Sequence, residues 1–152
     1  MEKIDHTDAR ILARLQQDAA QSLDKLGDAI GLSRNACWRR LRAMEEAGII
    51  LGRVALIDPV AVGLGLMVFM QIRTHSHDPD WQDRFARATR AIPEILSVYR
   101  MTGDLDYLIR ARVRDMAGYD DLYQRLIHNV PIADVSASFV MEEIKDTTAL
   151  PV

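Results

Sequence analysis

Apolar residues in the N-terminal third of the chain recur at helical spacing in three short stretches. Each set falls on one side of a helix with about 3.6 residues per turn, so each stretch is predicted to bury one helical face. The second and third stretches follow closely on one another, as the two helices of a helix-turn-helix do. The apolar positions are Ile11, Leu12 and Leu15 (in a helix expected over about 8–17), then Leu23, Leu26 and Ile30, and finally Cys37, Leu41 and Met44.

Residues that begin and end helices separate these stretches. Thr7 and Ser33 are expected N-caps, because a side-chain hydroxyl accepts hydrogen bonds from the free N–H groups of a first helical turn. Gly31 can take the positive φ that a sharp helix exit requires, and Gly48 is expected to end the third helix. Gly27 has no side chain and lets the next helix cross closely. The pattern therefore predicts a small three-helix domain with a tight turn before its last helix.

The pattern changes after the third helix. Residues 53–57 predict a strand, which Asp58-Pro59 closes, and Gly63 and Gly65 mark a flexible connection. The predicted division of the chain is a winged or simple helix-turn-helix DNA-binding domain at 1–50, a hinge strand and linker at 51–65, and a second domain at 66–152.

The second domain alternates between strand patterns and helix patterns. Pro93 and Pro131 each follow a helical stretch and are expected to end it. The order is βαββαβ, which is typical of a ferredoxin-like domain with four antiparallel strands and both helices on one face, in the α+β class. Strands are expected over 66–74, 95–101, 105–113 and 135–144, and helices over 80–92 and 115–129.

The face of this sheet without helices must be either wetted or covered. We expect Val68, Met70 and Val140 to lie on that face. An apolar sheet face favours contact between two copies of the chain, sheet against sheet.

The composition of the chain predicts its cellular location, and its charges are unevenly distributed. The chain of 152 residues has one cysteine and a net charge of −3. It has no apolar run of the ~20 residues that span a membrane and no signal-peptide core, so a cytoplasmic location without membrane contact is expected. Five arginines fall between Arg34 and Arg53, where only Glu45 and Glu46 oppose them. A local basic face on an acidic body still supports binding to phosphates.

Several stretches together resemble the Lrp/AsnC (feast/famine) regulators, and in particular the Lrp-like branch. IDHTDARILARLQQDA resembles the first helix of that family, GLSRNACWRRLRAMEEAGII its turn and recognition helix, and GRVALIDPVAVGLGL its hinge. MTGDLDYLIRARVRDMAGY resembles the effector-domain segment, and VSASFVMEEIKDTTALP the closing strand and tail. The resemblance implies a bacterial, nucleoid-associated homodimer that assembles to tetramers or octamers. It also implies an amino acid or a related small metabolite as effector, and no cofactor.

The polar side of the third helix is the candidate DNA-binding surface. The N-terminal part of such a helix reaches base edges in the major groove, where arginine can bind guanine and asparagine adenine. Arg40 lies next to the core position Leu41, and either a phosphate contact or a salt bridge within the fold would explain it. Trp38 either packs in part or reaches the DNA. The predicted DNA-binding residues are Ser33, Arg34, Asn35, Trp38, Arg39, Arg40, Arg42 and Arg53.

The turn at Gly103 is the candidate effector site. Two carboxylates that flank a turn can receive an α-ammonium group, and exposed turn amides can receive an α-carboxylate. The alternative is an ordinary hairpin turn whose aspartates bond local amides. The family resemblance adds further residues, with two serines contributed across an interface and Met101 and Leu108 as selectivity elements. The predicted set is Met101, Thr102, Gly103, Asp104, Asp106, Tyr107, Ser136 and Ser138.

Other chemistry receives little support from the sequence. Cys37 lies on a buried helical face and is expected to behave as a small hydrophobe rather than a redox sensor. His75 and His77 are metal-ligand types in a polar loop, without a further cluster beside them. No catalytic constellation is present, so the chain is not expected to be an enzyme. The leading hypothesis is an effector-responsive, sequence-specific transcription regulator, and the alternatives are an effector-independent DNA-compacting protein and a metal-dependent enzyme using Asp104 and Asp106.

Overall fold

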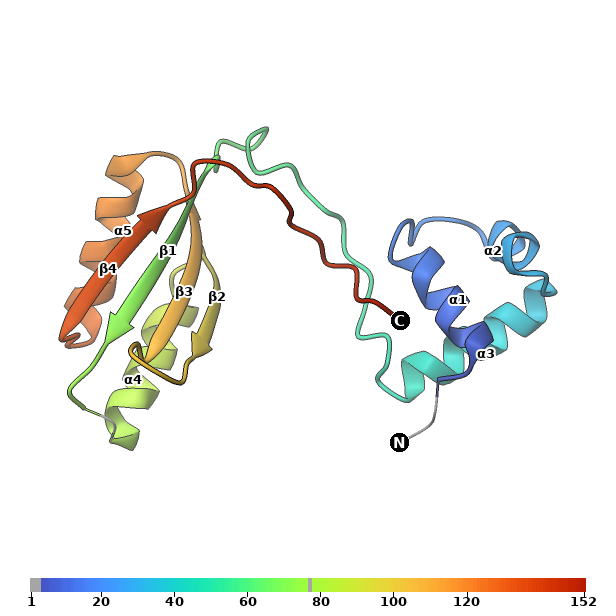
Figure 1. Ribbon diagram of the computed structural model, residues 1–152, viewed down its shortest axis with the longest axis horizontal. Helices are drawn as coiled ribbons and strands as arrows, with labels where there is room; N and C mark the ends of the chain where they lie inside the picture. The colour runs from blue at the N-terminus through green and yellow to red at the C-terminus, as the bar shows by residue number, and fades with distance from the viewer. Residues whose placement is uncertain (1–3, 77) are drawn as a thin grey trace. The chain divides into compact units, whose positions relative to one another are not determined.

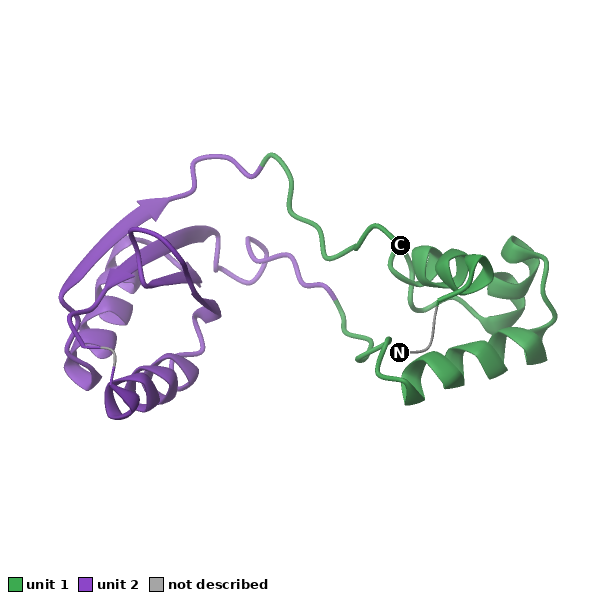
Figure 2. Ribbon diagram, turned by 60° about the horizontal axis from the view of Figure 1, so that its bottom comes forward, with its two compact units in different colours: residues 1–55, 144–152 green, residues 56–143 purple. Residues whose placement is uncertain are grey.

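The computed structural model describes residues 4–76 and 78–152. The chain forms two compact units, Met1–Ala55 with Ile144–Val152, and Leu56–Glu143. The chain therefore passes between the units twice, once through the hinge and once through the C-terminal tail, as the colours of Figure 2 show.

The first unit is the predicted three-helix domain. Its helices are α1 (His6–Leu15), α2 (Leu23–Ile30) and α3 (Arg34–Glu46). They bury one shared core, to which every predicted face contributes: Ile11, Leu12, Leu26, Ile30, Cys37, Leu41 and Met44. The helical periodicity of the sequence is thereby confirmed.

The start of α1 differs from the prediction. Its N-cap is Asp5 and not Thr7, because Asp5 and Asp8 cap one another's backbone. The Asp5 carboxylate accepts from the Asp8 amide at 2.8 Å, and the Asp8 carboxylate accepts from the Asp5 amide at 3.2 Å. This reciprocal pair satisfies two backbone N–H groups, whereas a threonine hydroxyl would satisfy one.

The turn between α2 and α3 is built as predicted. Gly31 ends α2 with φ at 76°, and the Ser33 hydroxyl accepts from the Ala36 amide at 3.3 Å to cap α3. A Cβ atom on Gly27 would lie 2.4 Å from the Leu32 carbonyl oxygen, so no side chain fits there. Every feature of this turn is held by residues near it in sequence.

The hinge forms no strand, so the prediction for residues 53–57 was wrong. Gly48 ends α3 with φ at 71°, as predicted, and the chain then runs in an irregular course to β1. A strand needs a neighbouring backbone, and residues 53–57 have no backbone hydrogen-bond partner among the residues that the structure describes. Val54 and Leu56 are 84% and 77% exposed.

The second unit has the predicted βαββαβ order and confirms the α+β class. Its four-stranded sheet is antiparallel in the order β2-β3-β1-β4. Figure 1 shows α4 and α5 on the same side of this sheet. The elements are β1 (Leu66–Arg73), α4 (Pro79–Arg90), β2 (Ile95–Arg100), β3 (Tyr107–Val113), α5 (Met116–Asn129) and β4 (Asp134–Phe139).

The prediction for the open face of the sheet was wrong at two of its three positions. Val68 and Met70 are fully buried against the helices, because successive strand residues point to opposite faces and these two belong to the core set. Their neighbours Met67 and Phe69 therefore occupy the open face. Val140, whose amide donates to the Met67 carbonyl at 3.0 Å, stands beside them.

The C-terminal tail returns to the first unit. The Gln16 side-chain amide donates to the Leu150 carbonyl at 3.0 Å and accepts from the Leu150 amide at 2.6 Å. This pair fastens the end of the chain to the residue that caps α1. None of the helices in the described part of the chain is long and apolar enough to cross a membrane.

Candidate functional site

The outward face of α3 carries the polar side chains that the sequence predicted for it. Because Cys37, Leu41 and Met44 point into the core, most of the remaining positions of α3 are exposed. Trp38 is 55% exposed, so it is not packed as a core residue. The other exposed side chains of this face are Arg34, Asn35, Arg39 and Arg42. Ser33 precedes them as the N-cap.

Most arginines of this region are already paired with a carboxylate. Arg34 lies 3.5 Å from Asp24 on α2. Arg42 lies 3.4 Å from Glu46 and 3.9 Å from Glu45, and Arg53 lies 2.8 Å from Glu45. Within residues 4–76 and 78–152, Arg39 makes no ion pair.

Arg40 holds α3 against the start of α1. Its guanidinium group donates to Asp5 at 2.7 Å and to Asp8 at 2.8 Å. The Asp8 amide, and after it the Arg40 side chain, lowers the pKa of Asp5. Of the two explanations that the sequence left open for Arg40, the structure shows the salt bridge. This arginine therefore points away from the exposed side of α3 and toward α1.

The thiol of Cys37 is buried in the same core, and its burial raises its pKa. A thiol with a raised pKa forms little of the reactive thiolate, which agrees with a packing role.

The candidate effector turn is a short loop between β2 and β3. The Met101 amide donates to the Asp106 carbonyl at 2.8 Å and closes the loop, and Gly103 takes a φ of 102° that favours glycine. Thr102, Gly103 and Asp104 are exposed.

The two aspartates of this loop differ in their surroundings. The Asp106 carboxylate accepts from the Thr74 amide at 2.8 Å, and the Asp106 amide donates to the Ile72 carbonyl at 3.0 Å. Asp106 thus ties the loop to the end of β1. Asp104 is exposed, so it is the carboxylate that an approaching ligand meets first.

The structure does not bring all the predicted effector residues to one surface. Tyr107 is buried on the helical side of the sheet, where its ring lies 4.6 Å from that of Phe85 and 5.7 Å from that of Trp81. Ser136 and Ser138 lie opposite Gln71 and Phe69 in the register and share the open face with them. The ring of Tyr107 and the two serines are therefore on opposite sides of the sheet.

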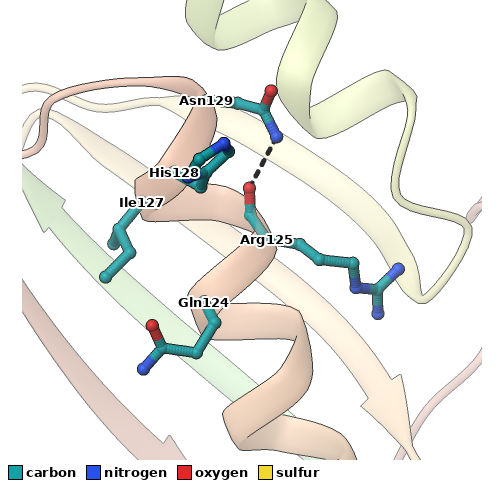
Figure 3. A pocket seen from close by; sticks show the side chains of 5 residues that line it. All are labelled: Gln124, Arg125, Ile127, His128 and Asn129. Carbon is teal, nitrogen blue, oxygen red and sulfur yellow. Dashed lines mark hydrogen bonds between the residues drawn. The ribbon is translucent and has the colours of Figure 1, made fainter.

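One concave surface of the second unit lies away from this loop. A depression of about 480 Å³ follows the C-terminal half of α5, where the Asn129 side chain donates to the Arg125 carbonyl at 2.7 Å (Figure 3). Its lining is Gln124, Arg125, Ile127, His128 and Asn129 and includes none of residues 101–107.

The described part of the structure adds no support for metal binding. In the described ranges no group of three or more His, Cys, Asp and Glu side chains could hold a metal ion. His75 is exposed, and His77 lies outside the described residues.

The sequence reasoning missed the acidic partners. Asp5 and Asp8 carry the spacing of a capping box, which would have identified the N-cap. Nothing in the sequence links Asp24 to Arg34 or Thr74 to Asp106, because those contacts join residues that only the fold brings together.

Residues 4–45 match the family model of the AsnC-type helix-turn-helix domain, and residues 67–150 match that of the Lrp/AsnC ligand binding domain. The chain belongs to the Lrp/AsnC family. It is therefore a helix-turn-helix transcription regulator with a ligand-binding domain.

Similar Lrp/AsnC proteins match over nearly the whole chain. The DNA-binding transcriptional activator DecR of Escherichia coli K12 is 46% identical over 150 residues, covering 98% of this chain and 99% of its own. A crystal structure of an AsnC family regulator from Agrobacterium tumefaciens has a TM-score of 0.94 at 48% identity and covers 97% and 96% of the two chains. The L-Met complex of the regulator NMB0573 from Neisseria meningitidis has a TM-score of 0.93 at 36% identity, covering 98% and 97%.

Proposed function

We propose that this Lrp/AsnC regulator binds duplex DNA through the exposed face of α3 and binds a small amino acid at the loop between β2 and β3. The observation that carries the first half is the exposed polar face of α3, directly after the glycine turn of an AsnC-type helix-turn-helix. Arg39 and Asn35 are the groups on this face that are free to read base edges. Ser33, Arg34, Arg42 and Arg53 would supply phosphate contacts, and Trp38 an apolar contact.

The effector half rests on the chemistry that an amino acid presents. Its α-ammonium group needs a carboxylate, and Asp104 is exposed in the loop. Its α-carboxylate needs N–H donors, which the backbone amides of the exposed residues Thr102, Gly103 and Asp104 would supply. The related Neisseria regulator forms a complex with L-Met, which supports an amino acid as the ligand class here. Met101 and Leu108 would meet the side chain of the effector.

A second copy of the chain completes this proposal. The open face of the sheet bears Phe69, which is half-buried, and the two serines. In the hinge, Leu51 is 95% exposed, and other large apolar residues are exposed with it. Association through these surfaces would bury the apolar residues and place Ser136 and Ser138 of one protomer near the loop of another. We propose a homodimer that assembles to a tetramer or an octamer.

These assignments give each part of the chain its own role. Residues 1–50 bind DNA, 51–65 form the hinge, and 66–152 bind effector and oligomerise. The two recognition helices of a dimer would enter half-sites about 34–36 Å apart. Effector binding would shift the equilibrium between oligomers by its differential affinity for them. The protein acts in the cytoplasm on the nucleoid, with no cofactor and no catalysis.

Thermal unfolding against the proteinogenic amino acids and related sulfur compounds tests the effector half. A ligand at a hundred times its Kd adds about 2.7 kcal/mol to the free energy of unfolding, and we expect a clear rise in Tm for one or a few of them. A flat response to the whole panel would contradict an amino acid effector and favour an effector-independent architectural protein.

A further inference from the structure

Apart from Arg39, the arginines that face DNA in the proposed function are paired with carboxylates of the same chain. Arg34 pairs with Asp24, Arg42 with Glu46 and Glu45, and Arg53 with Glu45. Arg40 is held by Asp5 and Asp8. Four of the five arginines between Arg34 and Arg53 are therefore paired, and Arg39 is the fifth. The carboxylates that pair with them are Asp5, Asp8, Asp24, Glu45 and Glu46.

This pairing is unusual for a surface that meets phosphates. Non-specific binding to DNA comes almost entirely from cationic side chains that neutralise phosphates and release counterions. An arginine that is already paired must first leave its carboxylate, and it then leaves that carboxylate close to a polyanion. The pairs therefore weaken attraction to DNA of any sequence.

We propose that Asp24, Glu45 and Glu46 compete with DNA phosphates for the arginines of this surface and so determine the specificity of the regulator. The proposal rests on the proposed binding of DNA by α3. At an operator, base contacts from α3 compensate for the broken ion pairs. At other sequences only phosphates are available, and the competition prevents stable binding.

Exposure separates Asp24 and Glu46 from Asp8, which helps to hold Arg40. Asp24 and Glu46 are 64% and 69% exposed, and ion pairs so exposed to water are weak enough for a phosphate to displace. Asp8 is only 16% exposed and also caps α1, so its pair with Arg40 is part of the fold. Glu45 contacts both Arg42 and Arg53 and is the acid through which two arginines are restrained at once.

Helix α2 offers a matched pair of variants. Asp24→Asn removes the partner of Arg34, whereas Asp28→Asn removes an equal charge one turn later on the same helix. Asp28 is exposed and makes no ion pair in the described part of the chain. Any effect common to both variants comes from net charge alone.

Two duplexes of equal length provide the readout. One is selected from a random pool by the wild-type protein, and the other is its shuffled sequence. We expect Asp24→Asn to raise the affinity for the shuffled duplex about threefold, and the combination with Glu45→Gln and Glu46→Gln to raise it about tenfold. Affinity for the selected duplex should rise less, so the ratio of the two affinities falls.

Salt dependence gives an independent measurement. For the shuffled duplex, the slope of log K against log[salt] should steepen by up to about 0.9 for each arginine freed to contact a phosphate. Asp28→Asn should leave this slope unchanged. A merely structural role of the three acids would not alter the slope in this direction.

Equal affinity ratios in the wild type and the triple variant would overturn the proposal, and so would equal effects of Asp24→Asn and Asp28→Asn. Circular dichroism identifies a variant that fails to fold, in which case the matched single variants decide the question. A wild-type protein that binds no duplex would remove the proposed function itself, and that result is distinct from an unchanged ratio.

Discussion

The two turns that carry the candidate sites are held in place in opposite ways. The turn between α2 and α3 depends on neighbours, since Gly27, Gly31 and Ser33 all lie within the segment they shape. The loop between β2 and β3 depends on a distant residue, because Asp106 bonds the amide of Thr74, which lies 32 positions earlier. The first turn is rigid by its local geometry. The second is positioned only when the sheet has formed.

This difference agrees with the two roles that we propose, DNA binding by α3 and effector binding by the loop. A recognition helix must present a fixed surface to the major groove, and short-range contacts provide one. A loop that responds to an effector benefits from contacts that couple it to the rest of its domain. Asp106 supplies such a contact, since it joins the loop to the strand β1 at the centre of the sheet.

Gly27→Ala is expected to break the first turn and to have the largest effect. The added Cβ would lie 2.4 Å from the Leu32 carbonyl oxygen, which is backbone and cannot move aside without shifting α3. We expect the free energy of unfolding to fall by about 2–4 kcal/mol and DNA binding to weaken with it. Gly52→Ala is the control, because a Cβ there meets nothing within 4 Å. Equal denaturation midpoints for the two variants would refute this account of the turn.

Substitutions of the two aspartates in the loop between β2 and β3 should separate the positioning of the loop from the binding of the effector. Asp106→Ala leaves the partly buried Thr74 amide without its acceptor, and we expect a loss of about 1–3 kcal/mol in the free energy of unfolding. Asp104→Ala should leave stability unchanged and abolish the rise in Tm with effector, while DNA affinity stays within a few-fold. Urea denaturation measures the free energy of unfolding, thermal melts with and without effector measure the rise in Tm, and fluorescence anisotropy measures DNA affinity. Loss of DNA binding in Asp104→Ala would show that the two roles are not separate.

The same contrast explains what the sequence could predict. Helical faces, the glycine turn, the Ser33 cap and the βαββαβ order follow from patterns within short windows, and the structure confirms them. The prediction failed where the structure of a segment depends on contacts with segments distant in the sequence. Residues 53–57 have strand character but no neighbouring strand in the described chain, and Val68 and Met70 were placed on the wrong face. The parity of β1 is set by its packing against α4 and α5, which an apolar run such as LMVFM does not reveal.

Two adjacent arginines of α3, Arg39 and Arg40, allow a DNA contact and a structural contact to be compared. Arg39→Ala should weaken binding to the selected duplex about tenfold, because this exposed arginine is free to contact a base, and leave Tm and oligomeric state unchanged. Arg40→Ala removes the two bonds that join α3 to Asp5 and Asp8, and we expect Tm to fall by a few degrees. Fluorescence anisotropy and thermal melts test the pair. A reversal of the two phenotypes would mean that Arg40 is the DNA contact.

Carboxyl pKa values offer the smallest and most local test of the contrast between contacts near in sequence and contacts with distant residues. The pKa of Asp5 is lowered mainly by the Asp8 amide, and the pKa of Glu94 is lowered mainly by Arg125, whose guanidinium group lies 2.6 Å from it. NMR titration should show that Arg40→Ala returns the pKa of Asp5 only in part, because the backbone hydrogen bond remains. Arg125→Ala should return that of Glu94 close to its ordinary value of 4.5.

The sign of the effect on stability follows from these directions. A carboxyl whose pKa is lowered by folding contributes stability that is present above its unfolded pKa and is lost as the pH falls through its folded pKa. Below about pH 4.5, protonation of Glu94 should therefore lower the free energy of unfolding more in the wild type than in Arg125→Ala. If both proteins lost stability equally over that range, the ion pair between Glu94 and Arg125 would be too solvated to stabilise the contact between α5 and the residue that precedes β2.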